Sequence, residues 1–323
     1  MNKKIFITRR IPQIGIDMLK QKGFEVDIYP KDEILPHKEL IKILKKGNYD
    51  GVLSLITDNI DASVFSAAST VKIFANYATG FDNIDTVEAK KRSITVTNAP
   101  SEIASEAVAE HAIALMLALA AQIVKGDEFM RKNKYKGWNP MGFIGTDILG
   151  KTLGIVGVGR IGGRVAHYAK GLGLNIIYTD VARNELLEKE CGAVFYASVE
   201  ELLPKADVVS LHTPLLDSTR HLINEDRLKT MKRTAFLINT SRGPVVDEKA
   251  LVVALRNKTI AGAGLDVFEF EPKLSAGLSK LPNVVLTPHI ASASIEARND
   301  MAVIAVQNIV DFFDGKTPKN KIV

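Results

Sequence analysis

One segment near the middle of the chain constrains the fold most, because it combines a strand, a glycine turn and a helix. The apolar run Leu153–Val156 is typical of a buried strand, and Gly157, Gly159 and Gly162 follow in G-x-G-x-x-G spacing. From Arg160 onward, apolar residues recur at helical spacing. In such an element the first glycine permits a tight turn, the second lets backbone approach a pyrophosphate, and the third lets the helix pack closely on the strand. The segment therefore predicts a dinucleotide site; glycines that serve only a tight turn are the alternative.

An acidic residue after the next expected strand supports this prediction. The strand Asn175–Tyr178 leads to Asp180, about 20 residues after the glycine turn, where a carboxylate accepts hydrogen bonds from a ribose diol. The same carboxylate would repel a 2′-phosphate, so NAD is favoured over NADP. Arg183 could bind that phosphate, although a solvated arginine at the start of a helix is the simpler interpretation.

Length and composition exclude several classes of protein. The 323 residues suffice for two domains, and 46% hydrophobic with 24% charged residues is typical of a soluble globular chain. The net charge is +5, but no basic block is interleaved with aromatic residues, so nucleic-acid binding is not indicated. The single cysteine, Cys191, excludes an intramolecular disulfide framework and a cysteine-cluster metal site. With no signal peptide at the N-terminus, we expect a cytoplasmic protein.

Neither a membrane span nor a metal site is expected. The long apolar stretch Ala107–Ile123 contains Glu110, His111 and Gln122, which makes it too polar to cross a bilayer comfortably. A buried or interface helix is the better interpretation. The sequence has no H-E-x-x-H motif or carboxylate cluster that would indicate a metal.

Strand-like runs alternate with helical patterns along the chain, which predicts an α/β protein with parallel sheets. The expected strands before the glycine turn are Lys4–Thr8, Glu25–Tyr29, Gly51–Leu55, Lys72–Asn76 and Ile94–Thr97. Those from the turn onward are Leu153–Val156, Asn175–Tyr178, Val208–Leu211, Thr234–Asn239, Gly262–Leu265 and Val284–Thr287. We therefore expect two doubly wound domains, a flavodoxin-like substrate domain and a Rossmann dinucleotide domain, with a cleft between them.

A proline-marked loop, Asn98–Pro100, places the domain boundary before a long helix at Ser101–Ala121. A last helix, Ile295–Asp314, has no strand after it and is expected to return to the first domain. The predicted division is residues 1–99 with 293–323 as the substrate domain, and residues 100–292 as the dinucleotide domain.

Three loops that follow expected strands carry polar groups suited to one reaction. Arg242 follows Thr234–Asn239, Asp266 and Glu271 follow Gly262–Leu265, and His289 follows Val284–Thr287. Because ligands of open α/β sheets bind outside the carboxyl ends of the strands, these side chains can meet beside a nicotinamide. Taken singly, the arginine could be a surface ion pair and the Pro-His loop could be structural.

These motifs together resemble the D-2-hydroxyacid dehydrogenase family over nearly the whole chain. The segments that carry the resemblance are Gly157–Gly162 with Asp180, Leu211–Pro214, Asn239–Asp247, Gly264–Pro272 and Thr287–Ile290. The resemblance implies that Arg242, Glu271 and His289 are catalytic. It also implies that a loop at Ala78, Thr79 and Gly80 binds the substrate carboxylate through backbone N–H groups, together with Arg242 and His289.

The chemistry of hydride transfer to a ketone agrees with these roles. Negative charge develops on the carbonyl oxygen, so a donor must stabilise and protonate it. His289 has a suitable intrinsic pKa range, and Glu271 would orient its ring. Arg242 can bind carboxylate and carbonyl oxygens with its planar fork, which a lysine does poorly.

The resemblance also implies a set of cofactor contacts. The residues expected to contact NAD are Gly157, Gly159, Arg160, Ile161, Gly162, Asp180, Thr213, Pro214, Thr219, Thr240, Ser241 and Asp266. Asp266 would accept from the carboxamide, although a structural carboxylate at the strand end is the alternative. His212 is interpreted as a structural histidine beneath the cofactor, whereas His37, His111, His167 and His221 have no supporting pattern.

Within the family, the segments Thr8–Pro12, Leu55–Asp58 and Gly137–Pro140 are most similar to glyoxylate and hydroxypyruvate reductases. The expected substrate is a small 2-keto or 2-hydroxy acid, and the expected assembly is a homodimer. Trp138 either reaches the substrate pocket of a neighbouring subunit or is an ordinary packed aromatic residue. The alternative functions are an NAD-sensing corepressor on the same scaffold and a phosphoglycerate dehydrogenase.

Overall fold

The computed structural model describes residues 3–323, which form two compact units. Unit 1 is the chain up to Ala104 together with Ala293–Val323, and unit 2 is Ser105–Ser292. The division falls inside helix α5 (Glu102–Ala120), a few residues after the boundary expected from the proline-marked loop.

Unit 1 contains a five-stranded parallel sheet in the order β2-β1-β3-β4-β5. Its strands are β1 (Lys4–Ile7), β2 (Glu25–Ile28), β3 (Gly51–Leu55), β4 (Ile73–Tyr77) and β5 (Thr95–Thr97). Its helices are α1 (Gln13–Gln21), α2 (His37–Gly47), α3 (Ala62–Ala67), α4 (Thr86–Lys91) and α12 (Ile295–Phe313). This strand order is the flavodoxin-like one that the sequence predicts.

Helices cover the sheet of unit 1 on both faces. Phe6, Val52 and Phe74 point from the strands into a core that they share with residues of α2, α3 and α4. The late helix α12 packs against β3, β4 and α1. A side chain on Gly15 of α1 would bring its Cβ to 3.1 Å from the Cβ of Ala302, so the glycine permits the close approach of α1 and α12.

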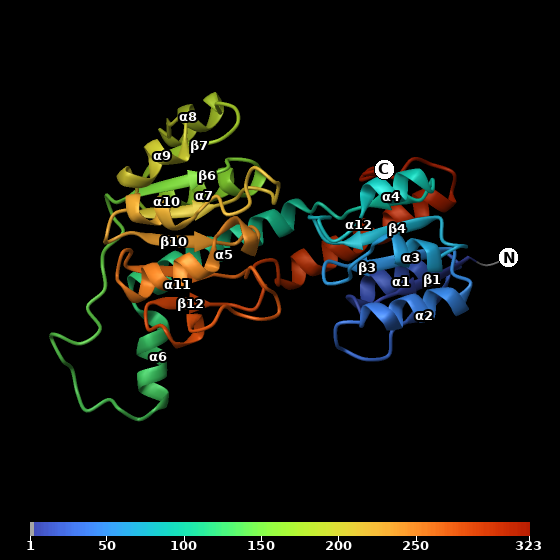
Figure 1. Ribbon diagram of the computed structural model, residues 1–323, viewed down its shortest axis with the longest axis horizontal. Coiled ribbons are helices and arrows are strands. Elements are labelled where there is room, and N and C mark those ends of the chain that lie inside the picture. Colours follow the sequence, from blue (N-terminus) through green and yellow to red (C-terminus); the bar gives the residue numbers. More distant parts are fainter. Residues whose placement is uncertain (1–2) are drawn as a thin grey trace. The chain divides into compact units, whose positions relative to one another are not determined.

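Unit 2 contains a seven-stranded parallel sheet in the order β12-β11-β10-β9-β6-β7-β8 (Figure 1). Its strands are β6 (Thr152–Val156), β7 (Asn175–Thr179), β8 (Val194–Phe195), β9 (Val208–Leu211), β10 (Phe236–Asn239), β11 (Gly262–Leu265) and β12 (Val284–Leu286). Its remaining helices are α6 (Ile123–Arg131), α7 (Arg160–Gly171), α8 (Glu185–Cys191), α9 (Val199–Leu202), α10 (Glu225–Thr230) and α11 (Glu248–Arg256). The six predicted strands are present. The two-residue β8, which the sequence analysis missed, is the third strand of the Rossmann order 3-2-1-4-5-6, and β12 extends the sheet beyond it at the other edge.

Alternate residues of these strands enter two different cores, as expected for a sheet with helices on both faces. Leu153 and Ile155 of β6 point to the core that contains residues of α5, α7 and α8. Val156 points to the other core, which contains residues of α9, α10 and α11. The fold therefore places the carboxyl ends of all seven parallel strands on one edge, where loops are free to carry functional groups.

Helix α5 is the one helix of the described chain that is long and apolar enough to cross a membrane by length and composition alone. Its residues Ala112, Leu115 and Met116 are buried in the core beside β6 and α7. A core helix passes the same test, and these contacts favour that interpretation.

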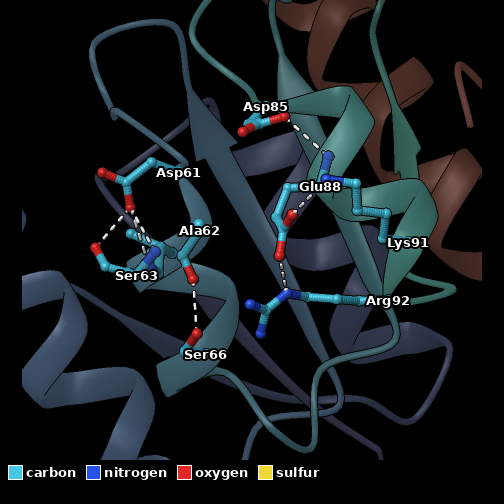
Figure 2. Close-up of polar contacts among 9 residues, drawn as sticks. Asp61, Ala62, Ser63, Ser66, Asp85, Glu88, Lys91 and Arg92 are labelled. Atoms are coloured by element: carbon cyan, nitrogen blue, oxygen red, sulfur yellow. Dashed lines mark hydrogen bonds and ion pairs between the residues drawn. The ribbon is translucent and has the colours of Figure 1, made fainter.

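Two short helices of unit 1 begin at aspartates that cap them (Figure 2). Asp61 accepts from the backbone N–H groups of Ser63 at 2.9 Å and Val64 at 3.1 Å, and Asp85 accepts from that of Glu88 at 2.9 Å. Glu88 also forms an ion pair with Arg92 one turn later, at 2.7 Å. Such caps satisfy N–H groups that a helix cannot bond internally, so α3 and α4 start at defined positions beside the sheet.

Helix α6 and the loop that follows it project from the body of unit 2 (Figure 1). Trp138 in this loop is 84% exposed and therefore does not pack against its own chain. The interpretation of this residue as an ordinary packed aromatic is wrong.

Candidate active site

The register of three neighbouring strands aligns the loops that carry the predicted catalytic residues. Asn239 of β10 pairs with Leu265 of β11, and Leu265 pairs with Leu286 of β12. The three strands therefore end at nearly the same level, and the loops that carry Arg242, Glu271 and His289 begin side by side.

Glu271 and His289 form the hydrogen bond that the sequence predicts. Nδ1 of His289 lies 3.0 Å from Oε2 of Glu271, and the backbone N–H of Phe268 donates to Oε1 at 2.9 Å. Burial works to raise the pKa of Glu271, but the contact with His289, the Phe268 N–H and the charge of Arg242 together lower it below its ordinary value. The carboxylate is thus kept anionic beside the imidazole ring.

Arg242 is held by the strand that precedes it. The side chain of Asn239 accepts from the backbone N–H of Ser241 and donates to the carbonyl of Arg242, both at 3.0 Å. A Cβ on Gly243 would lie 1.9 Å from the backbone carbonyl of Phe268, so only glycine allows the arginine loop to pack against the glutamate loop. This packing explains why the charge of Arg242 acts on Glu271.

Asp266 is fully buried and fixes the loop that carries His289. Its Oδ1 accepts from the Thr287 hydroxyl at 2.7 Å and from the Ile290 N–H at 2.8 Å, and its Oδ2 accepts from the Ala291 N–H at 2.8 Å. His289 itself has a φ of 55°, a conformation uncommon for a residue other than glycine. These bonds show Asp266 as a positioning carboxylate; its contact with a carboxamide stays a prediction.

His111, for which the sequence offers no pattern, also contacts this loop. Its Nε2 lies 2.9 Å from the hydroxyl of Thr287 and 3.6 Å from Oδ1 of Asp266. A residue of α5 thus supports the histidine loop from a distant part of the sequence.

A second carboxylate network, which the sequence analysis missed, holds the loop that carries Glu271. Glu248 at the start of α11 is buried and accepts from the backbone N–H of Glu269 at 2.8 Å and of Ser275 at 2.6 Å. Glu269 in turn accepts from the N–H of Glu248 at 3.1 Å and contacts Nε2 of His221 at 2.7 Å. An acidic residue at the first turn of a helix is common, so the sequence alone gave no sign of this network.

The glycine turn has the geometry that its spacing predicts. Gly157 has a φ of 90°, and a Cβ on Gly162 would lie 2.0 Å from the carbonyl oxygen of Gly157. Nothing lies within 4 Å of the position where Gly159 would carry a side chain. Asp180 is beside the turn, because the Val158 N–H donates to its Oδ2 at 2.7 Å.

The surroundings of the turn fit a dinucleotide. Among the residues described, the buried hydroxyls of Thr213 and Thr240 and the buried Nδ1 of His212 have no hydrogen-bond partner, which is unusual unless a ligand supplies one. Burial lowers the pKa of His212 to about 3, so this ring is neutral beneath the turn. The Thr219 hydroxyl instead donates to the Pro214 carbonyl at 2.6 Å within its own loop.

The predicted substrate loop belongs to unit 1 and follows β4. The side chain of Asn98 donates to the Thr79 carbonyl at 2.7 Å, and that of Asn76 donates to the Gly80 carbonyl at 2.9 Å. The Ala99 N–H donates to the Ala78 carbonyl at 2.8 Å. Unit 1 thus satisfies the carbonyl groups of the loop with its own donors.

Comparison with known proteins now decides the family. Residues 113–291 match the model of the D-isomer specific 2-hydroxyacid dehydrogenase NAD-binding domain. The chain belongs to this family. It is 49% identical to a glyoxylate reductase of Korarchaeum cryptofilum over 100% of this chain and 96% of that protein. It is 48% identical to a glyoxylate reductase of Pyrococcus horikoshii over 98% of this chain and 95% of that protein.

The solved structures agree with this assignment. An NADPH-dependent glyoxylate/hydroxypyruvate reductase of Sinorhizobium meliloti, in complex with NADP and malonate, has a TM-score of 0.88 at 30% identity. The alignment covers 100% of this chain and 97% of that one. The chain is therefore an oxidoreductase of the D-2-hydroxyacid dehydrogenase type.

The lowered pKa of Glu271 predicts a specific acid sensitivity. Because the folded protein holds this pKa below its ordinary value, the unfolded chain binds the proton more tightly. The stability that Glu271 contributes is present above the ordinary pKa and is lost as the pH falls through the folded-state value. In Glu271→Gln, we expect the melting temperature to fall less steeply than in the wild type as pH decreases from about 5 to about 3.

The control is Glu185→Gln, because Glu185 is exposed at the start of α8. This variant should keep the wild-type slope. Equal slopes for Glu271→Gln and the wild type would show that the bond to His289 does not stabilise the carboxylate.

Proposed function

We propose that this protein reduces glyoxylate, or a similarly small 2-keto acid, with NADH, and that His289 supplies the proton. The contact that carries the proposal is the hydrogen bond between Glu271 and His289, formed beside Arg242 at the ends of adjacent strands. The names of the relatives that match over nearly their full length support glyoxylate as the substrate.

The Glu271–His289 pair determines which ring nitrogen donates. When bound, the nicotinamide cofactor supplies the hydride, which reaches the carbonyl carbon of the substrate. Since Nδ1 of His289 faces Glu271, Nε2 is the atom that donates a proton to the developing alkoxide. The anionic Glu271 fixes the orientation of the imidazole ring through its contact with Nδ1. In the reverse direction, the same nitrogen accepts the proton of the hydroxyl group.

Arg242 is proposed to bind the oxygen atoms of the substrate. Its planar guanidinium can contact a carboxylate oxygen and the carbonyl oxygen of a 2-keto acid at once, and its charge stabilises the alkoxide. Backbone N–H groups of Ala78, Thr79 and Gly80 are proposed to bind the substrate carboxylate, in a loop that donors of unit 1 hold in place through its carbonyl groups.

The dinucleotide would be held by the glycine turn and the strand ends around it. Backbone N–H groups of Gly159, Arg160 and Ile161 at the start of α7 suit the pyrophosphate, since the positive end of the helix dipole lies there. Asp180 suits the ribose diol. Pro214, Thr219 and the unpartnered hydroxyl of Thr213 are proposed on the adenosine side, with Thr240, Ser241 and Asp266 on the nicotinamide side.

Turnover is the direct test of this function. Mixed with NADH and glyoxylate, hydroxypyruvate or pyruvate, the protein should oxidise NADH, seen as a loss of absorbance. Binding of NADH without turnover of any 2-keto acid would favour the NAD-sensing alternative instead.

His289→Ala should lower kcat by a factor of about 10² to 10⁴, because general acid catalysis typically contributes that much. NADH affinity, measured by the fluorescence change on binding, should stay within about twofold of the wild type, since His289 is not one of the residues proposed to bind the phosphates or the ribose of the cofactor. His37→Ala in unit 1 is the matched control and should keep full turnover. Wild-type kcat in His289→Ala would refute the acid role.

The choice of NADH over NADPH rests on Asp180 and on the partner of Arg183. Arg183 could bind a 2′-phosphate, but Nε and Nη2 donate to the two carboxylate oxygens of Glu188 at 2.7 and 2.8 Å. Glu188 is itself held by the hydroxyl of Tyr178 at 2.8 Å. The guanidinium of Arg183 is therefore already paired with a carboxylate, and the negative charge of Asp180 would repel a 2′-phosphate. The NADPH dependence of the Sinorhizobium meliloti relative makes this choice worth testing.

In the wild type, NADH should bind at least about tenfold more tightly than NADPH, as measured by fluorescence titration. Glu188→Gln should narrow that ratio severalfold, because it frees the guanidinium without removing the hydrogen-bond acceptor of Tyr178. Glu190→Gln on the same helix is the control and should leave the ratio unchanged. A wild type that prefers NADPH would show that Asp180 does not exclude the phosphate.

We also propose that the protein is a homodimer whose interface includes α6 and the loop after it. This segment exposes large apolar side chains that its own unit leaves uncovered: Met130, Tyr135, Trp138, Met141, Ile144 and Leu149. Such an extended apolar surface is unusual for a monomer, and a second copy of the chain would cover it.

Sedimentation should give twice the 35.3 kDa mass of the chain. The double variant Trp138→Ser, Met141→Ser should shift the protein toward monomer by weakening the association at least about tenfold. A control that removes two exposed apolar residues elsewhere, Val181→Ser with Leu186→Ser, should remain dimeric. A monomeric wild type would refute the proposal.

A further inference from the structure

Unit 1 contains a pocket that none of the roles above explains. Its volume is about 310 Å³, and it is lined by Arg9, Arg10, Ile11, Pro12, Asp32, Leu55, Tyr77 and Arg298. Three of these eight residues are arginines, which is unusual for a hollow that serves only packing.

The pocket lies where ligands of open α/β sheets usually bind. Arg9 follows the end of β1, Leu55 ends β3, and Tyr77 ends β4. In the order β2-β1-β3-β4-β5, the chain first proceeds to one side of β1 and then crosses to the other, so the direction reverses between β1 and β3. The carboxyl ends of the strands at such a reversal form the general ligand position of these folds.

The charge of the lining is incompletely balanced. Nε of Arg9 pairs with Oδ1 of Asp32 at 2.7 Å, so one arginine has its counter-charge. Arg10 donates to the neutral side chain of Gln13 at 3.2 Å. Within residues 3–323, neither Arg10 nor Arg298 forms an ion pair, and two positive charges therefore remain at the pocket.

Two further features concern the segments that line the pocket. The hydroxyl of Tyr77 donates to the backbone carbonyl of Arg298 at 2.7 Å, which fixes the first turns of α12 against the end of β4. Pro12 precedes α1 without a side-chain cap, so the positive end of that nine-residue helix also faces a pocket-lining segment. Solvated arginines would be the simple alternative, but they do not account for a hollow at the reversal point.

We propose that this pocket binds a small oxyanion, either a phosphate or a carboxylate. The guanidinium groups of Arg10 and Arg298 offer planar forks that match two oxygens of such a group, which a lysine would not. The site belongs to unit 1 and uses none of the residues proposed above for the cofactor, the reacting carbonyl or the first substrate carboxylate.

The oxyanion has two possible sources. It is either a free anion or the second acidic group of a substrate, and the second source rests on the proposed 2-keto acid reduction. Binding and selectivity measurements separate the two.

Binding is measured by calorimetric titration of the full-length protein with inorganic phosphate. Arg10→Gln and Arg298→Gln should each weaken phosphate affinity about tenfold, the loss expected for one charge-assisted bidentate contact. Arg233→Gln in unit 2 removes the same charge from an exposed arginine and should stay within about twofold of the wild type. Arg298→Lys keeps the charge and loses the fork, so its affinity should lie between those of the wild type and Arg298→Gln.

No phosphate binding by the wild type, or equal affinity in the wild type and both glutamine variants, would overturn the site. In the latter case phosphate would be bound elsewhere, for example at Arg242 or at the glycine turn. Melting curves of every variant verify that it folds. If Arg298→Gln does not fold, Arg298→Lys still provides the test of this residue.

Selectivity is measured as kcat/KM for glyoxylate and for oxaloacetate, which carries a second carboxylate. If the pocket receives that carboxylate, Arg298→Gln should lower the oxaloacetate-to-glyoxylate ratio about tenfold. An unchanged ratio together with weakened phosphate binding assigns the site to a free anion. If the protein reduces neither compound, the proposed function fails, while the phosphate titration still decides whether the site exists.

Discussion

The geometry of the candidate active site depends on the hydrogen bonds that the buried carboxylate of Asp266 accepts. It accepts hydrogen bonds from Thr287, Ile290 and Ala291, and thereby ties the end of β11 to the loop after β12. His289 lies within this loop at a positive φ, a conformation that is unfavourable on its own. A buried carboxylate with such bonds is costly to disrupt, so the loop has one well-defined position. The histidine is placed by its neighbours rather than by its own backbone preference.

The same physical device recurs at other strand ends of unit 2. Glu248 accepts backbone N–H groups of the glutamate loop, and Asp180 accepts one from the glycine turn. Loops at the edge of a sheet have backbone groups that the ladder cannot satisfy, and a carboxylate can accept two or three of them at once. The functional edge of this sheet is thus stiffened by acidic side chains, only some of which would contact a ligand.

The sequence predicted the parts of this protein that depend on local patterns. Short strand-like runs identified the strands from β1 to β12, apart from the two-residue β8, which is too short to show a period. Motif spacing identified Gly157, Arg242, Glu271 and His289. The supporting contacts could not be predicted in this way, because Glu248 meets Ser275, and His111 meets Thr287, only after distant segments have packed. The partner of Arg183 and the arginines of the unit 1 pocket are likewise products of tertiary structure.

The exposure of the Glu271–His289 pair has a consequence for its chemistry. Each side chain is 36% accessible to water, so solvent screens the attraction between the carboxylate and the ring. Burial already opposes the negative charge of Glu271, yet the ring, the Phe268 N–H and Arg242 together outweigh it. A ligand that displaces water from this surface removes the screening and strengthens these contacts. The bond between Glu271 and the ring of His289 would then hold the ring more firmly in the orientation that the proposed proton transfer requires.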